Sequence, residues 1–177
     1  MIQKPDELWG KIPRKKLDKI FECPYCEFDY TFLGFTKQYK EVLDYTRESM
    51  VIIDLGCSAA IQSYYFKKYR QYIGVDVVPT KPNEDFPNDI WQARLSYPNT
   101  LHYACTIQHF IKYIFPNLHF SKEECFAVMS YVPDGEASKM AIDFFPNIKV
   151  YYPGGKEGGI DFLRYNNTVY KDDYYYN

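Results

Sequence analysis

The stretch of sequence that decides the fold is residues 51–60, which read VIIDLGCSAA. Residues 50–55 form a nearly continuous apolar run, and such a run predicts a strand buried on both faces. Gly56 ends this strand, and Ser58 can cap a helix over residues 58–69. The chain therefore passes directly from a buried strand into a helix, as it does in a βαβ unit.

The same alternation of strands and helices extends on both sides of this stretch. The other predicted elements are helices over residues 36–49, 90–95, 108–115 and 135–145, and strands over residues 71–78, 100–107, 125–131 and 148–152. Alternating elements predict an α/β fold in which helices flank a mostly parallel sheet. The tail differs, because residues 160–165 and 168–171, joined by Asn166 and Asn167, predict a C-terminal β-hairpin.

The length of 177 residues indicates one domain, which can bury a core without disulfides or metals. We expect this domain over residues 36–177. An N-terminal extension is expected over residues 1–35, where Pro5, Pro13 and Pro24 interrupt any long helix.

Charge and hydropathy argue against several classes of protein. The net charge is -2 and the sequence pI is about 5.9, so binding to nucleic acid is not indicated. No apolar run is long enough to span a bilayer, so no membrane partner is expected. The first residues lack the apolar core of a signal peptide. We therefore expect a cytoplasmic protein.

The five cysteines agree with a reducing compartment. Cys57, Cys105 and Cys125 lie in or beside apolar segments that read as core strands, which favours buried free thiols. Cys23 and Cys26 form the single CxxC of the chain, and no second pair or paired histidine follows. A zinc site needs about four ligands, so we expect no metal here. Two cysteines at a loop or helix end are favoured over a structural zinc or a redox pair.

The turn after the first strand has the features of a ligand site. Gly56 lets the backbone approach a ligand closely, and the N-terminus of the following helix offers free N–H groups. The next predicted strand carries a carboxylate, Asp76, near its end. An acid in this position accepts hydrogen bonds from a ribose diol in dinucleotide-binding folds.

In these residues the chain resembles the class I S-adenosylmethionine-dependent methyltransferases. The first motif of that family is an acidic residue, any residue, and then glycines at alternate positions. Asp54 and Gly56 match it, whereas Ser58 and Ala60, both small, replace the second and third glycines. Asp76 matches the acidic residue that the family places after its second strand. The resemblance covers roughly residues 36–152.

The resemblance implies a Rossmann-like fold that binds S-adenosylmethionine and transfers its methyl group to an unidentified acceptor. The cofactor-binding residues would be Asp54, Gly56, Cys57, Ser58 and Asp76. Of these, Asp54 and Gly56 would border the methionine part, and Asp76 would hold the ribose hydroxyls.

Further residues follow from the later strands of the family. Ile107 and Gln108, after the third strand, would lie near the adenine. Ser130, Tyr131 and Asp134, after the fourth strand, would face the methyl acceptor and are the candidates for the substrate side of the reaction.

The sequence also departs from the family pattern. Ile107 stands where many relatives have an acid, and residues 130–134, SYVPD, are not the motif of amino-methylating nucleic-acid enzymes. No full helix fits between Tyr152 and Ile160, where the family usually has one. A second function therefore stays open, namely a non-catalytic protein with a methyltransferase-like fold that serves in binding or assembly.

Overall fold

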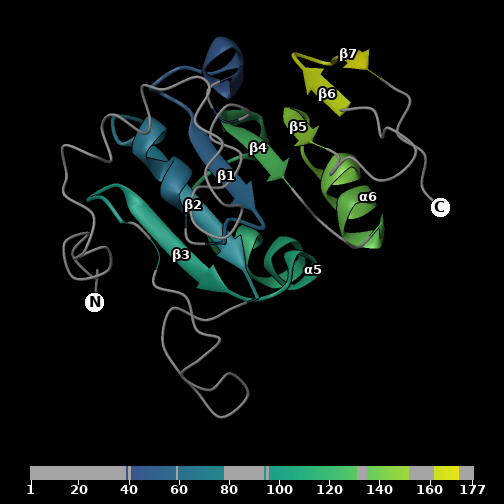
Figure 1. Cartoon of the computed structure of the whole chain (residues 1–177). Coiled ribbons are helices and arrows are strands. Elements are labelled where there is room, and N and C mark those ends of the chain that lie inside the picture. The colour runs from purple at the N-terminus through teal and green to yellow at the C-terminus, as the bar shows by residue number, and fades with distance from the viewer. Residues whose placement is uncertain are drawn as a thin grey trace, which may run out of the picture.

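The computed structural model describes residues 39, 41–58, 60–77, 94, 96–130, 135–151 and 162–171 (Figure 1). The predicted N-terminal extension lies outside these residues, and so does the pair Cys23 and Cys26. Tyr131 and Asp134, two of the three residues predicted on the substrate side, also lie outside them.

A seven-stranded sheet in the order β3-β2-β1-β4-β5-β6-β7 is the centre of the described structure. The strands are β1 Val51–Leu55, β2 Gln71–Asp76, β3 Thr100–Ala104, β4 Cys125–Ser130, β5 Ile148–Tyr151, β6 Phe162–Tyr165 and β7 Thr168–Lys171. The first five pair in parallel. β6 runs antiparallel to β5, and β7 runs antiparallel to β6. The predicted α/β class and mostly parallel sheet are confirmed.

Helical segments connect the parallel strands. They are η1 Leu43–Tyr45, η2 Ile61–Phe66, α5 Ile107–His109, η3 Phe110–Ile114, η4 Phe115–Asn117, η5 Lys122–Glu124 and α6 Gly135–Phe144. The segments η1, η2, η4 and η5 are 3₁₀ helices, and η3 is a π-helical turn. Among the described residues, α6 is the longest of them.

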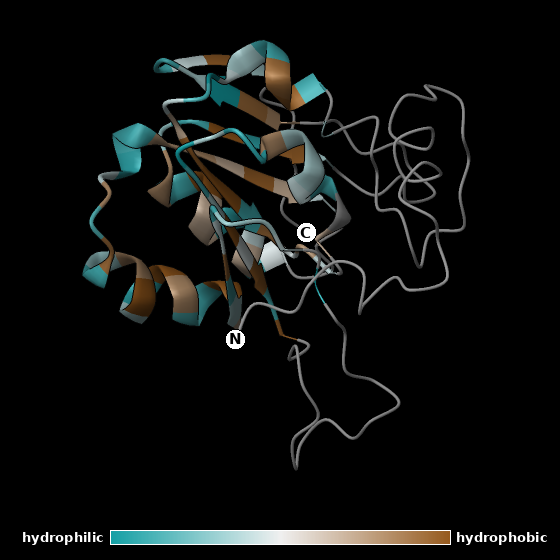
Figure 2. Cartoon of the chain, turned by 90° about the vertical axis from the view of Figure 1, so that its left-hand side faces the viewer, coloured by the Kyte–Doolittle hydropathy of each residue, from teal (hydrophilic) through white to brown (hydrophobic). Residues whose placement is uncertain are grey.

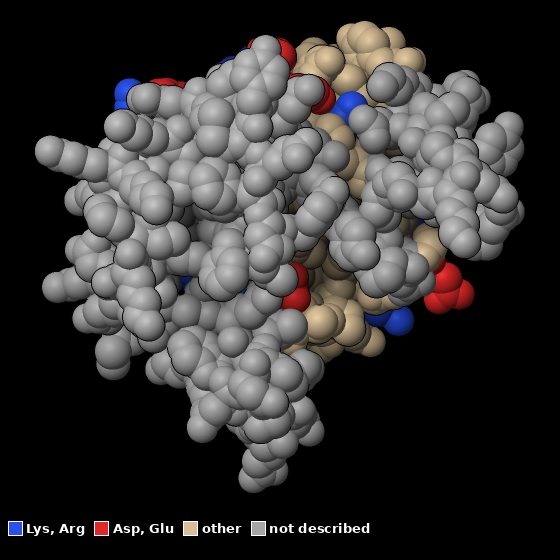
Figure 3. Space-filling view, in the orientation of Figure 1, with Lys and Arg blue, Asp and Glu red and all other residues tan. Residues whose placement is uncertain are grey.

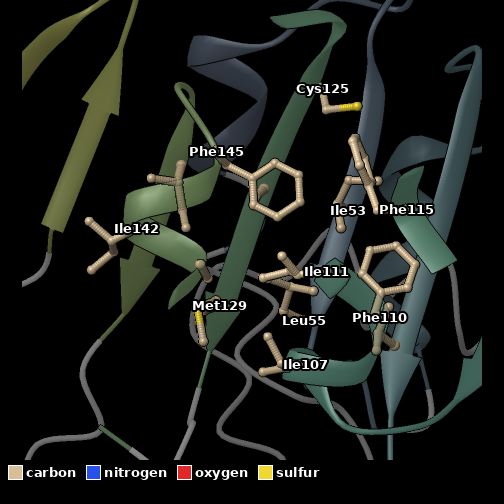
Figure 4. Close-up of a cluster of buried hydrophobic side chains, with 14 of the residues drawn as sticks. Ile53, Leu55, Ile107, Phe110, Ile111, Phe115, Cys125, Met129, Ile142 and Phe145 are labelled. Atoms are coloured by element: carbon tan, nitrogen blue, oxygen red, sulfur yellow. The ribbon is translucent and has the colours of Figure 1, made fainter. Parts of the chain in front are cut away.

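One face of the sheet packs against α5, η3 and α6. Side chains alternate between the two faces of a strand, and Ile53 and Leu55 of β1 point to this side. Figure 4 shows them with Phe110 of η3 and with Ile142 and Phe145 at the end of α6. We call this set of buried side chains the first core cluster.

The opposite face packs against η2 and the segment that contains η1. Ile52 of β1 and Tyr72 of β2 lie on this side, together with Tyr39, Val42 and Phe66. This second core cluster is richer in tyrosine than the first. Figure 2 shows mostly apolar strands inside mixed outer segments, which is the pattern of a sheet covered on two faces.

Several predicted boundaries were wrong, and local hydrogen bonds explain two of them. The predicted helix over 36–49 ends at Tyr45, because the Thr46 hydroxyl donates to the Val42 carbonyl and the backbone becomes extended. The strand predicted over 100–107 ends at Ala104, because Thr106 caps α5 by accepting from the His109 N–H at 3.1 Å.

Three other predicted elements also differ. The helix predicted over 58–69 is the shorter η2, and the strand predicted over 71–78 ends at Asp76. Of the helix predicted over 90–95, Arg94 is the one described residue, and it belongs to no helix.

Arg164 joins the last two strands to α6. Its Nη2 donates to the carbonyls of Ile142 and Phe145, and its Nε donates to the carbonyl of Pro146 at 3.2 Å. The last carbonyls of a helix lack partners within the helix, and a cation there also opposes the negative end of the helix dipole. This side chain therefore holds β6 against the C-terminal end of α6.

Within the described ranges, no helix combines the length and the apolar composition that a membrane span requires.

Candidate functional site at the carboxyl ends of the parallel strands

The strand order reverses direction between β1 and β4. From β1 the chain builds outward to β2 and β3, whereas β4 and β5 extend the sheet on the other side. Ligands of open parallel sheets bind outside the carboxyl ends of the strands at such a switch point. Most of the predicted site residues that the structure describes gather at these strand ends.

The turn that follows β1 is left-handed at alternate residues. The φ angles are 84° at Gly56, 49° at Ser58 and 53° at Ala60. These are the three positions that the resemblance aligns with the glycines of a motif, and the last two are occupied by residues with a Cβ. A left-handed conformation costs such a residue about 1–2 kcal/mol. The turn therefore has, at Ser58 and Ala60, a backbone conformation that glycine adopts more readily.

Ser58 does not cap a helix, contrary to the prediction. Its left-handed backbone is incompatible with that role, and Ala60 is the residue that precedes η2. Instead, the Ser58 N–H donates to Asp76 Oδ2 at 2.8 Å. The N–H groups of Gly56 and Cys57 donate to the Val75 carbonyl at 2.8 and 3.0 Å. These bonds fix the turn to the end of β2.

Asp76 lies where the sequence predicts it, at the last position of β2. Its carboxylate is half-buried and faces the turn through the bond with Ser58. Its backbone carbonyl accepts from the Cys105 N–H at 3.0 Å and from Arg94 Nη2 at 3.1 Å. Sequence analysis missed Arg94, whose buried guanidinium also donates to the Tyr103 carbonyl. Arg94 thus braces the ends of β2 and β3 under this site.

Asp54 is enclosed by protein rather than open to a ligand. Its side chain has no exposed surface, and its carboxylate accepts from Tyr39 Oη at 2.6 Å, from Gln62 Nε2 at 2.6 Å and from Tyr72 Oη. Burial raises the pKa of Asp54 to about 6, although these three hydrogen bonds oppose the rise. In this structure a ligand can interact with Asp54 only indirectly, by way of Tyr39, Gln62 or Tyr72.

Tyr39 connects Asp54 with the predicted substrate side. Its hydroxyl lies 2.9 Å from Ser130 Oγ, and Ser130 is the last residue of β4. The structure therefore brings Ser130 next to Asp54 through a shared tyrosine. Sequence analysis missed Tyr39 because it is one of 19 tyrosines and precedes Asp54 by a full helical segment.

The Cys57 side chain is buried against β2. Its Sγ lies against Gly74, where an added Cβ would come within 2.9 Å of it and within 2.7 Å of His102 Nδ1. The side chain is 1% exposed, and burial raises the pKa of its thiol well above the ordinary value. The thiol also contacts the turn, because its Sγ lies 3.6 Å from the Ser58 carbonyl oxygen.

Ile107 lies in the first turn of α5 rather than at the end of β3, where the sequence predicts it. Gln108 lies in α5, in agreement with the helix predicted to begin at this residue. The Ile107 side chain belongs to the first core cluster, whereas Gln108 is half-buried. The Thr106 cap causes this difference, because it starts the helix before the strand can extend further.

Charged residues form no dense patch on the described surface in view. In Figure 3 the lysines, arginines, aspartates and glutamates that are drawn in colour are scattered. Within the described ranges, no three side chains of His, Cys, Asp or Glu come together as a metal site.

Comparison with known proteins assigns no family to the chain. No protein-family model matches the sequence, and no curated protein matches it.

Proposed function

We propose that this chain is an S-adenosylmethionine-dependent methyltransferase with a Rossmann-like fold. The observation that carries the proposal is the turn after β1, left-handed at Gly56, Ser58 and Ala60 and bonded to the Asp76 carboxylate. Backbone strain at residues with a Cβ is typical of functional sites, where the surrounding structure maintains it. The strand order supports the same location.

The residues present fit the ribose end of this cofactor. The Asp76 carboxylate is an acceptor group at a strand end, as hydroxyl donors require, and the turn beside it lets a ligand approach the backbone. The bound cofactor would supply a methyl group on a sulfonium, which needs mainly positioning and exclusion of water for its transfer. Gly56 and Ser58 would contribute backbone contacts.

A non-catalytic binding or assembly protein is the second candidate function. The observation that favours it is the enclosure of Asp54 by Tyr39, Tyr72 and Gln62, which leaves that carboxylate no surface for the methionine part. In that case the fold would persist without the cofactor.

Calorimetric titration with S-adenosylmethionine and S-adenosylhomocysteine separates the two candidates. We expect the wild type to bind both, and Asp76→Ala to lower affinity about tenfold or more, because a hydrogen bond to a charged group contributes roughly 1.5–3 kcal/mol. Gly56→Val should abolish binding by obstruction. Asp143→Ala, which removes an exposed carboxylate of α6, is the matched control and should bind as the wild type does. Failure of the folded wild type to bind either compound would favour the second candidate.

A further inference from the structure

The hydrogen bonds between Asp54, Tyr39 and Ser130 have a fixed direction. An ionised carboxylate has no hydrogen to donate, and a tyrosine hydroxyl has one. Because Tyr39 donates that hydrogen to Asp54 Oδ1, it must accept in its bond with Ser130 Oγ. Ser130 is therefore the donor to Tyr39. Its oxygen can accept a hydrogen bond in turn.

The three hydrogen-bonded residues become less buried from Asp54 toward Ser130, at the carboxyl end of β4. Asp54 and Tyr39 have no exposed surface, whereas Ser130 is 7% exposed and is the last residue of β4. The other carboxylate oxygen of Asp54, Oδ2, accepts from Gln62 and Tyr72. These two bonds orient the carboxylate so that Oδ1 faces Tyr39. The chain of hydroxyls therefore leads from the carboxyl end of β4 to a buried base.

We propose that Ser130, Tyr39 and Asp54 form a proton relay that takes the proton of a hydroxyl group on a ligand at the carboxyl end of β4. The ligand proton passes to Ser130 Oγ, the Ser130 proton to Tyr39 Oη, and the Tyr39 proton to Asp54 Oδ1. Three O–H bonds break and three form. The negative charge moves from Asp54 to the ligand oxygen, and no other reactant is needed.

The relay also indicates the class of methyl acceptor, an inference that rests on the proposed function. A hydroxyl oxygen becomes a strong nucleophile only when it loses its proton, and a relay ending in a base supplies that step. The raised pKa of Asp54 makes it a stronger base than an ordinary carboxylate. Among hydroxyl groups, phenols give up their proton most readily, because their pKa is near 10, as in tyrosine. We infer that the methyl acceptor is a phenol.

The groups around Asp54 are compatible with this role. Burial raises the pKa values of Tyr39, Tyr72 and Cys57, so these groups stay neutral while Asp54 titrates. The charge of Asp76 raises the pKa of Asp54 further. Tyr39 and Asp54 act through Ser130 and are positioning residues, whereas Ser130 is the group that would touch the ligand.

Infrared difference spectroscopy of the full chain tests the relay without any cofactor. The carboxyl band that disappears in Asp54→Asn identifies Asp54, and its intensity between pH 4 and pH 8 gives the titration. Tyr39→Phe should raise the midpoint by about one to two pH units, which corresponds to the loss of one hydrogen bond to a charged group. Ser130→Ala should raise it by less, because the Ser130 hydroxyl strengthens Tyr39 as a donor.

The control is Tyr69→Phe, which removes a hydroxyl on the same face that bonds to Thr46 Oγ1 and not to Asp54. It should leave the Asp54 midpoint unchanged. If Ser130→Ala also leaves the midpoint unchanged while the fold is intact by circular dichroism, the relay is overturned. A shift in Tyr39→Phe alone would then mean that Tyr39 is only a hydrogen-bond donor.

Phenol and anisole test whether the ligand at Ser130 is a phenol. Saturating phenol, which can donate to Ser130, should lower the Asp54 midpoint in the wild type and not in Ser130→Ala. Anisole, which has the same ring but no hydroxyl hydrogen, should have no effect. Equal effects of phenol and anisole, or none from either, would exclude a phenolic donor at this position. Because no arm uses S-adenosylmethionine, failure here is distinct from failure of the calorimetric test.

Discussion

Replacing Ser58 by glycine should stabilise the fold relative to replacing it by alanine. Ser58 holds a left-handed backbone with φ at 49°, and this conformation costs a residue with a Cβ about 1–2 kcal/mol. Glycine escapes that cost but loses about 0.5–1 kcal/mol more conformational entropy than alanine on folding. The difference leaves Ser58→Gly more stable than Ser58→Ala by about 0.5–1 kcal/mol. Both variants lose the hydroxyl, so their comparison isolates the backbone.

Urea denaturation of four variants measures this difference. Ser49 supplies the reference site, because it is an exposed serine whose φ is not positive. There the order should reverse, and Ser49→Gly should be less stable than Ser49→Ala by about 0.5–1 kcal/mol. In thermal scans of a chain of this size, a gain of about 1 kcal/mol corresponds to about 2–4 °C. A Ser58→Gly variant that is no more stable than Ser58→Ala would refute the left-handed turn.

Two further predictions concern the residues around this turn. Gly74→Ala should destabilise the fold by about 1–3 kcal/mol in urea denaturation. The reason is that the added Cβ would come within 2.7 Å of His102 Nδ1 and within 2.9 Å of Cys57 Sγ. A variant as stable as the wild type would contradict this packing. The pKa of Asp54 is raised from 3.8 to about 6 on folding, so between these values the folded chain holds a proton that the unfolded chain has released. The free energy of unfolding should therefore fall as the pH rises from about 4 to about 6, by on the order of 3 kcal/mol. Asp54→Asn should lack this pH-dependent contribution. If the free energy of unfolding depends on pH in the same way in both proteins, the raised pKa of Asp54 is ruled out.

The strands of the sheet are the part of the fold that the sequence predicts best. Residues 50–55 and 125–131 are nearly continuous apolar runs, and such runs have few alternatives in an α/β chain. The observed β1 and β4 end within one residue of these limits. Helix type is harder to predict. Residues 58–69 have helical spacing, but the left-handed Ala60 delays the helix and makes it a short 3₁₀ segment.

The candidate site was predictable only in its local part. Gly56, Ser58 and Asp76 lie in a turn and at a strand end, and the spacing of the motif places them. The partners of Asp54 come from three separate segments, so no spacing rule connects Tyr39 or Gln62 with that carboxylate. The alternation of side chains in β1 and β2 does place Tyr72 on the same face of the sheet as Asp54, and that signal could have been used.

Within the part of the chain that the structure describes, each face of the sheet has one buried cysteine, and this has a consequence for chemical labelling. Cys57 lies in the second core cluster and Cys125 in the first, with 1% and 0% of their surfaces exposed. Burial raises the pKa of both thiols, that of Cys125 to about 12. Alkylating reagents need an accessible thiolate, so each sulfur reacts only when its own layer opens. With the other cysteines replaced by serine, the two alkylation rates would report separately how often the helices on each side leave the sheet.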